Sequence, residues 1–574
     1  MENRRNLIIA VVLCIGILVL WDRFFLPKTQ PAKPTTSSEV TDKKVAPAAT
    51  KAPASQPGES TSAPEQMARR GAEEIITMQT EDVKFVLSTW GASLKAVYLI
   101  KDKFQGRKGD DRPLGAPLDI LRAPDGQPAA FTIGFENAGF SLPSDVAWNV
   151  VERSDTKVTF LATVAGATVR KTFTALPQSY RLNLHVSVRN EAQSEQKHSL
   201  ALHIPGYQEP SKKGGGLFSY AVSSVEEMVC EVDGSIKRNS VPDLSKEAVS
   251  LDGVIRWIAA DERFFTLAAV APLQDLQSRR RCRQQASNED QGEVILSLAE
   301  QALKPGAEIT YPFALYTGPK YRKQLAEVMA MPIVGASPPK GALTDADVEL
   351  DASVNVTFAF ISRPMMLTLR AFFGLTGNWG LAIILLTLVV KLVTFYPAHK
   401  ALLSGKRMAR LSPKVAELKE KFGNDRERLG RETMALYKSQ GVNVLGGCVP
   451  SLIQMPIWIA LYSTLSYSVE LYRANFVGYI HDLSAPDPYY LLPLVMGVTM
   501  FVQMRMTPAG TDPQQQKIMS VMMPVMFTFF QVFLPSGLAL YVLTNYLLGI
   551  LHQVIINRLE KSSETPKLAA KAAR

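Results

Sequence analysis

The sequence predicts a multi-pass α-helical membrane protein of six spans that carries a large extracytoplasmic β-sandwich domain. Hydrophobic residues make up 47% of the 574 residues and charged residues 20%, which is high for a soluble protein and low for one that lies wholly in a bilayer. Five of the six long apolar runs follow Trp379, so a polar N-terminal body precedes a membrane body. This organisation excludes a cytosolic enzyme, a fibre and a disordered scaffold.

The net charge of +10 supplies the third observation. The excess of Lys and Arg lies in segments that alternate across the apolar runs, namely residues 1–6, 398–445, 505–517 and 558–574. Such a distribution is typical of cytoplasmic loops. We therefore expect both termini in the cytoplasm and residues 27–355 on the opposite side of the membrane.

The chain begins with a predicted membrane anchor at residues 1–26. Arg4 and Arg5 precede the apolar stretch Leu7–Leu26. Because no small-residue cleavage site follows, an uncleaved anchor fits better than a signal peptide. Residues 27–72 are rich in Pro, Ala, Thr, Ser, Lys and Gln, and such a segment cannot bury enough apolar surface to fold. We expect a disordered linker there.

Residues 73–335 are predicted to form the β-sandwich domain, with a closing helix at Lys320–Met329. Short alternating or β-branched runs are separated by Gly, Pro, Asn and Asp, a pattern typical of antiparallel strands. Cys230 and Cys282 share this domain, where an extracytoplasmic location would allow them to pair. The expected strands are Val83–Ser88, Lys157–Val164, Thr168–Thr174, Arg181–Arg189, Ser199–Ile204, Phe264–Val270, Glu293–Leu298 and Glu308–Tyr316.

The membrane body is predicted to begin with an amphipathic interfacial helix at residues 353–374. Five spans follow within residues 379–558, each near the roughly 20 residues that a bilayer core requires. Residues 398–441 show helical apolar spacing and are predicted to form a cytoplasmic helical hairpin, and residues 559–574 form a basic cytoplasmic tail. The expected spans are Trp379–Pro397, Leu445–Val469, Tyr489–Met506, Lys517–Leu534 and Gly537–Asn557.

Lys391 is the one ionisable residue well inside a predicted C-terminal span. A lysine at the centre of a bilayer costs about 3 kcal/mol on insertion scales, so it requires water, a partner or the interface. One interpretation is that its ammonium group snorkels to the interface. The other is a polar site, because uncharged hydrogen-bonding residues recur on the spans. The candidate site residues are Lys391, Thr387, Gln454, Tyr541 and Asn545, with Thr394, Gln503 and Gln531 as further lining residues.

These residues lack the equipment of an enzyme. The spans offer no nucleophile with a base and an orienting group, and no His or carboxylate cluster for a metal. We therefore expect no catalytic residue, no metal and no cofactor. No Asp or Glu lies inside the five spans and no internal repeat is found, which disfavours a proton-coupled transporter. One cation among neutral hydrogen-bonding groups suits the transient reception of a polar peptide.

Several C-terminal motifs resemble those of the YidC branch of the YidC/Oxa/Alb membrane protein insertases. The resemblance covers roughly residues 355–558, and the order of anchor, linker and β-rich domain is similar to that of the Gram-negative members. The motifs are Gly377-Asn378-Trp379-Gly380, Leu445-Gly446-Gly447-Cys448, Leu452-Ile453-Gln454-Met455-Pro456, Asp487-Pro488-Tyr489-Tyr490, Gln515-Gln516-Lys517-Ile518-Met519, and Pro535-Ser536-Gly537-Leu538 followed by Leu540-Tyr541.

The resemblance implies a five-span insertase core in the bacterial inner membrane and a β-sandwich in the periplasm. A hydrophilic, positively charged groove, open to the cytoplasm and to lipid, would receive nascent membrane proteins and help them fold, with or without the Sec translocon and its accessory subunits. The basic hairpin and tail would contact the ribosome, including its RNA, or anionic lipids; DNA is not an expected partner.

One site residue departs from the family pattern. Lys391 stands where the family usually has arginine, which keeps the charge but loses the guanidinium fork. Two alternatives from other classes stay open. One is a small-solute or ion transporter, and the other is a structural assembly factor that acts through its β-rich domain.

Overall fold

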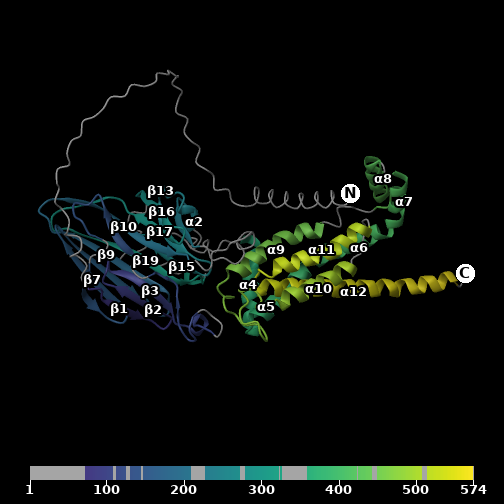
Figure 1. The fold of residues 1–574 in the computed structure, drawn as a ribbon, viewed down its shortest axis with the longest axis horizontal. Helices are drawn as coiled ribbons and strands as arrows, with labels where there is room; N and C mark the ends of the chain where they lie inside the picture. Colours follow the sequence, from purple (N-terminus) through teal and green to yellow (C-terminus); the bar gives the residue numbers. More distant parts are fainter. Residues whose placement is uncertain are drawn as a thin grey trace, which may run out of the picture. The chain divides into compact units, whose positions relative to one another are not determined.

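The structure is a computed structural model, and it divides into a β-rich N-terminal region and a helical C-terminal region, coloured purple to teal and green to yellow in Figure 1. The predicted anchor, and the predicted linker up to residue 71, lie outside the described residues. The described residues are 72–107, 112–124, 129–143, 147–208, 226–271, 278–321, 323–325, 359–422, 425–441, 449–506 and 513–572.

The β-rich region contains three antiparallel sheets. The strand orders are β1-β2-β3-β4, β13-β16-β17-β10-β18 with β5 also paired to β10, and β12-β11-β14-β15-β19-β9-β8-β7-β6. The strands are β1 Ile75–Gln79, β2 Val83–Ser88, β3 Ser93–Leu99, β4 Leu118–Asp119, β5 Thr132–Glu136, β6 Asn149–Arg153, β7 Lys157–Val164, β8 Ala167–Ala175, β9 Arg181–Asn190, β10 Gln196–Tyr207, β11 Glu227–Val232, β12 Ser235–Ser240, β13 Val249–Gly253, β14 Ile255–Asp261, β15 Phe265–Val270, β16 Arg280–Asn288, β17 Gln291–Ser297, β18 Gln301–Leu303 and β19 Glu308–Pro319.

All eight predicted strands are confirmed, and two of them, β2 and β7, have the predicted ends. Strand β9 shows why the pattern was readable, since every second residue from Leu182 to Val188 is fully buried. Successive side chains of a strand point to opposite faces, so one buried face leaves a period of two in the sequence. Of the predicted closing helix, only residues 323–325 are both described and helical.

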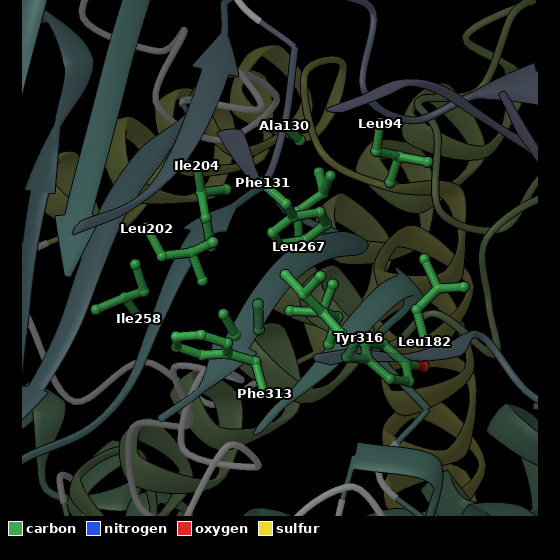
Figure 2. Close-up of a cluster of buried hydrophobic side chains, with 14 of the residues drawn as sticks. Leu94, Ala130, Phe131, Leu182, Leu202, Ile204, Ile258, Leu267, Phe313 and Tyr316 are labelled. Carbon is green, nitrogen blue, oxygen red and sulfur yellow. The ribbon is translucent and has the colours of Figure 1, made fainter. Parts of the chain in front are cut away.

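The core of the β-rich region lies between its sheets, as Figure 2 shows. Leu202 and Ile204 on β10 meet Ile258 on β14 and Phe313 on β19, and all four side chains are buried. Strand β10 belongs to the six-stranded sheet, and β14 and β19 to the nine-stranded one. Each such burial contributes about 1.5–3 kcal/mol relative to exposure. The two larger sheets therefore pack face to face, as the predicted sandwich requires.

Cys230 on β11 and Cys282 on β16 form a disulfide, a pairing that the sequence left open. Their Cα atoms lie 6.5 Å apart, and both side chains are fully buried. The bond joins the nine-stranded sheet to the six-stranded sheet, so it cross-links the two layers of the sandwich.

The helical region carries nine helices within the described residues. Its core includes Leu369 of α4, Ile383 of α5, Leu461 of α9, Met496 of α10 and Leu540 of α12. The helices are α4 Ala359–Thr376, α5 Trp379–Val393, α6 Phe395–Arg410, α7 Ser412–Phe422, α8 Arg426–Ser439, α9 Val449–Tyr467, α10 Leu491–Met506, α11 Pro513–Gln531 and α12 Ser536–Ala572. The β-rich region adds the short helices η1 Asp102–Phe104 and α2 Val241–Leu244.

Helix length and composition support fewer spans than predicted. Within the described residues, Ser536–Leu559 of α12 is long and apolar enough to cross a membrane by itself. Helices α5 and α6 pass the same test only as a pair bent by 64°. Helix α10 and the segment Ser520–Gln531 of α11 are apolar but shorter. The count of six spans stays a prediction.

The predicted span Trp379–Pro397 is wrong at its C-terminal end, because α5 stops at Val393. Pro397 has no backbone N–H to offer the carbonyl of Val393, and its ring would clash with that carbonyl in a continuous helix. The chain therefore bends at Thr394 and continues as α6 in a new direction.

The predicted hairpin at residues 398–441 is also corrected, since its first arm consists of two helices, α6 and α7, that meet at Leu411. Pro413 explains this break in the same way, because it cannot bond to the carbonyl of Ala409. Leu411 and Tyr437 are buried together against Met408, so α7 and α8 do form a hairpin with a small core of its own. The predicted break at Gly423 and Asn424 lies outside the described residues.

The predicted interfacial helix at residues 353–374 corresponds to α4, which runs from Ala359 to Thr376; residues 353–358 are not described. Met365 and Leu369 are buried, whereas Phe360 and Leu367 are exposed. Arg370 of α4 forms an ion pair with Glu470, with 2.5 Å between Nη2 and Oε1. This pair ties α4 to the loop that follows α9.

Candidate functional site

The start of α5 explains the motif Gly377-Asn378-Trp379-Gly380. Gly377 has a φ of +64°, in the left-handed region that glycine adopts readily. Asn378 caps α5, since its Oδ1 accepts hydrogen bonds from the N–H groups of Gly380 and Leu381 at 2.9 and 3.1 Å. A Cβ at Gly380 would lie 1.9 Å from the ring of Phe476. The motif thus builds a helix end and a close contact.

Two further motifs start α10 and α12. Asp487 accepts hydrogen bonds from the N–H of Leu492 at 2.6 Å and from the hydroxyl of Tyr479 at 3.1 Å. The hydroxyl of Ser536 donates to the carbonyl of Asp482 at 3.0 Å, and the N–H of Gly537 donates to the carbonyl of Leu483 at 2.9 Å. These motif residues fix the starts of α10 and α12 by hydrogen bonds to neighbouring loops, at the end of the bundle where α5 begins.

Lys391 lies at the other end of α5, in its last turn, and is partly buried. A cation there interacts favourably with the carbonyl end of the helix dipole. Within the part of the chain that the structure describes, no carboxylate lies within ion-pair distance of the Lys391 ammonium group. The lysine therefore lies three residues before the bend at Thr394 and has no described countercharge.

Gln454 and Tyr541 are brought together by the fold. The Nε2 of Gln454 on α9 donates a hydrogen bond to the hydroxyl of Tyr541 on α12, over 3.2 Å. Tyr541 is 1% exposed, so this hydrogen bond is made away from bulk water. The predicted set thus contains one polar contact between two helices that are far apart in the sequence.

The hydroxyl groups of the two predicted threonines, Thr387 and Thr394, donate hydrogen bonds to backbone carbonyls of α5. The hydroxyl of Thr387 donates to the carbonyl of Ile383 at 2.7 Å, and that of Thr394 donates to the carbonyl of Val390 at 2.8 Å. Such bonds to the preceding turn are the usual way in which threonine is accommodated in a helix. Both side chains are buried, and each hydroxyl oxygen retains capacity to accept a further bond.

The other predicted residues lie on α10, α11 and α12. Asn545 follows Tyr541 by one helical turn and is partly buried. Gln503 of α10 packs against Gly549 of α12, where a Cβ would approach its Nε2 to 2.6 Å. Gln531 of α11 is buried, and its Nε2 has no hydrogen-bond partner among the described residues. The structure brings no second pair of the predicted residues into a hydrogen bond within the described part of the chain.

One polar pair near Lys391 is not predicted by the sequence as a site. His399 on α6 and His552 on α12 face each other, with 3.4 Å between Nδ1 and Nε2. The sequence signal was limited to His552, which falls near the stripe of Tyr541 and Asn545 on α12. His399 belongs to the predicted hairpin, and it follows the bend after Val393.

The helices around Lys391 together carry positively charged residues and no negatively charged ones. Helices α5, α6, α9 and α10, and α12 as far as Leu559, contain no Asp or Glu. Such an arrangement can attract an acidic peptide and offer it hydrogen bonds. Within the described residues no group of three His, Cys, Asp or Glu side chains is placed to hold a metal ion.

Comparisons with known proteins agree with this architecture. Residues 371–564 match the family model "60Kd inner membrane protein", and residues 75–367 match the model "YidC periplasmic domain". The protein "Membrane protein insertase YidC" of Anaeromyxobacter sp. (strain Fw109-5) is 33% identical, over 99% of this chain and 100% of its own length. The protein of the same name from Haemophilus influenzae (strain ATCC 51907 / DSM 11121 / KW20 / Rd) is 32% identical, over 98% of each chain.

One solved structure, "Active YidC insertase crystal structure with the first transmembrane domain resolved", covers 85% of this chain and 93% of its own, at 18% identity and a TM-score of 0.35.

The two matched family models, together with the β-rich and helical regions that they cover, indicate the class of inner-membrane proteins with a periplasmic domain. The chain belongs to the YidC family of membrane protein insertases, as the relatives that match its whole length show. These relatives are named as insertases, which agrees with the prediction that the chain is not an enzyme.

Proposed function

We propose that this chain integrates proteins into the bacterial inner membrane through a polar groove around Lys391, Thr387, Gln454, Tyr541 and Asn545, with Thr394, Gln503 and Gln531 as further lining. The short polar extracytoplasmic segment of a nascent membrane protein, the client, enters this groove from the cytoplasm. Lys391 attracts its acidic residues. The carrying observation is the Gln454–Tyr541 hydrogen bond between α9 and α12, beside a helix whose lysine has no described countercharge.

The driving force comes from the client itself. Burying the client's apolar span in lipid yields about 0.8 kcal/mol per CH₂ group. Unpaired backbone groups of its polar segment are costly in hydrocarbon, and the groove lowers this cost by offering hydrogen bonds along part of the path. No nucleotide enters the mechanism, since the client's final state is more stable than its initial one.

The finer architecture belongs to the same proposal. The anchor at residues 1–26 and five spans within residues 379–558 cross the membrane, and both termini and residues 398–441 are cytoplasmic. Residues 27–355 are periplasmic and include the linker 27–72 and the domain 73–335. The amphipathic helix 353–374 follows and lies at the membrane interface. The hairpin and the tail 559–574 contact the ribosome, its RNA or anionic lipids. The chain works as insertase and chaperone, alone or with the Sec translocon and its accessory subunits.

The proposal is tested with purified full-length protein in liposomes and two matched single-span clients, whose translocated segments carry either Asp or Asn. The wild type should integrate both clients, measured as protease protection. Lys391→Ala should lower integration of the Asp client by about fivefold, the upper range for a partly solvated charge pair. Lys391→Arg should retain it, because the charge is kept.

The control is Lys304→Ala, which removes an exposed lysine of the β-rich region and should change nothing. Equal integration of the Asp client by the Ala and Arg variants would remove Lys391 from the mechanism. Solute flux through the wild type without any client integration would favour a transporter instead. Loss of all integration on deletion of residues 73–315 would favour an assembly factor that acts through the β-rich domain.

A further inference from the structure

His399 on α6 and His552 on α12 are held face to face near the end of α5. The Nδ1 of His399 lies 3.4 Å from the Nε2 of His552. The ring of Phe395 packs on both imidazoles, with ring centroids 5.7 Å from His399 and 4.9 Å from His552. Both histidines are partly buried. Phe395 therefore contacts both rings of the pair.

The surroundings of this pair are basic. His552 interacts electrostatically with His399 and with Lys391 of α5. Helix α10, which packs on α12, contributes Arg505, whose guanidinium lies over the ring of Phe501 at 5.1 Å. Lys400 follows His399 on α6, and α9 has no charged residue. Since none of these helices carries an Asp or Glu up to Leu559, the described residues there offer no carboxylate to the pair.

We infer that His399 and His552, together with Lys391, form a protonation-dependent binding site for the carboxylates of client segments. This inference rests on the proposed insertase function and extends it, because it makes the two histidines determinants of specificity for acidic clients. Lys391 supplies one positive charge, and the histidine pair supplies a second one when it takes up a proton.

The chemistry of the pair limits it to a single added charge. Two neutral imidazoles at this distance share one N–H, with one ring as donor and the other as acceptor. One added proton gives the pair a charge of +1 and is opposed by the positive charge of Lys391, and a second added proton is opposed by both charges. An imidazole ordinarily changes its charge between pH 5 and 8. Because the charge of Lys391 disfavours the added proton, retention of acidic segments should strengthen in the acidic part of this range.

The test uses full-length protein in liposomes at pH 8 and pH 6, with the matched Asp and Asn clients. Integration of the Asp client by the wild type should rise by about two- to fivefold at pH 6, as expected for one partly solvated charge pair. The Asn client should show no such rise. In His399→Gln/His552→Gln, which keeps hydrogen-bonding groups but cannot titrate, the rise should disappear.

The matched control is His481→Gln, which removes an exposed histidine from the loop between α9 and α10 and should keep the full pH response. Integration of the Asn client by the double variant at pH 8 reports that the variant is folded and active. An unchanged pH response of the double variant would overturn the inference and leave the insertase proposal intact. Failure of the wild type to integrate either client at either pH would instead overturn the proposed function.

Discussion

Glu293 on β17 is a carboxylate that its neighbours keep ionised. It accepts hydrogen bonds from His203 Nδ1 and Gln285 Nε2, each at 2.9 Å. Burial would raise the pKa of Glu293, but these hydrogen bonds and the charge of His203 outweigh burial and lower the pKa. A carboxylate with a lowered folded pKa stabilises the fold above its unfolded pKa of about 4.3 and loses this effect as pH falls.

Glu293→Gln should therefore lower the free energy of unfolding by about 1 kcal/mol at pH 7. The difference from the wild type should shrink as the pH falls below 4, where the wild-type carboxylate takes up a proton. Urea unfolding of both proteins at pH 7 and at a pH below 4 measures this difference in the free energy of unfolding. Glu247→Gln, at an exposed position, is the control. An equal loss at both pH values would show that the charge of Glu293 contributes nothing.

The Gln454–Tyr541 contact allows stability and function to be separated. Removing one partner leaves a buried polar group unpaired, whereas removing both is nearly neutral for stability. The double variant Gln454→Leu/Tyr541→Phe should keep the thermal midpoint of the wild type and integrate the Asn client several-fold more slowly. Protease protection and thermal unfolding give the two readouts. Wild-type integration by this variant would exclude the pair from the groove.

At the scale of single residues, the sequence reveals type and helix face but not partners. Periodicity placed Tyr541 and Asn545 on one stripe of a helix, and that stripe is a local property. Which helix lies opposite depends on packing between distant segments. For this reason the partnership of Tyr541 with Gln454, and of His552 with His399, could be seen only in the structure.

Among the elements, the start of α5 makes the sharpest prediction. Gly380→Ala should separate α5 from the loop that carries Phe476, because the new Cβ would lie 1.9 Å from a ring atom of that residue. We expect a loss of about 1–3 kcal/mol, as for other overpacked sites. Gly374→Ala in α4 is the matched control, since nothing lies within 4 Å of its added Cβ. Thermal unfolding in detergent should show a lower midpoint for the first variant only.

The elements also show where sequence patterns stop being informative. Strand β9 was predicted from its alternation, but alternation was not the whole signal. Strand β15, buried on every residue, was also predicted, whereas β1, which alternates strictly, was not. Helix ends were harder still. The bend after Val393 depends on Pro397, which lies within a run that is otherwise apolar enough to continue.

In the whole molecule, the disulfide is the main covalent constraint among the described residues. Cys230 and Cys282 are 52 residues apart, and closing a loop of this size stabilises a fold by about 2–4 kcal/mol. Cys230→Ala/Cys282→Ala should unfold at a correspondingly lower urea concentration. Dithiothreitol should destabilise the wild type and leave the double variant unchanged. Equal sensitivity of both proteins to the reductant would mean that the bond contributes no stability.

Composition alone was sufficient to divide the molecule. Strands are short and alternating before residue 320, and apolar helices follow residue 358, because a β-sandwich and a membrane bundle place opposite demands on hydropathy. The number of spans was not determined in the same way, since a helix shorter than the bilayer core reads like a buried helix of a soluble protein.

Helices α5 and α10 contain 15 and 16 residues, so each is about 23 Å long at 1.5 Å per residue. If both cross the membrane as proposed, they fall short of a hydrocarbon layer of roughly 30 Å. Acyl chains beside these two helices must then compress or tilt to match the shorter helices, and the bilayer next to α5 and α10 becomes locally thin. A polar chain that crosses the membrane beside α5 and α10 therefore passes through a thinner hydrocarbon layer than in the surrounding bilayer.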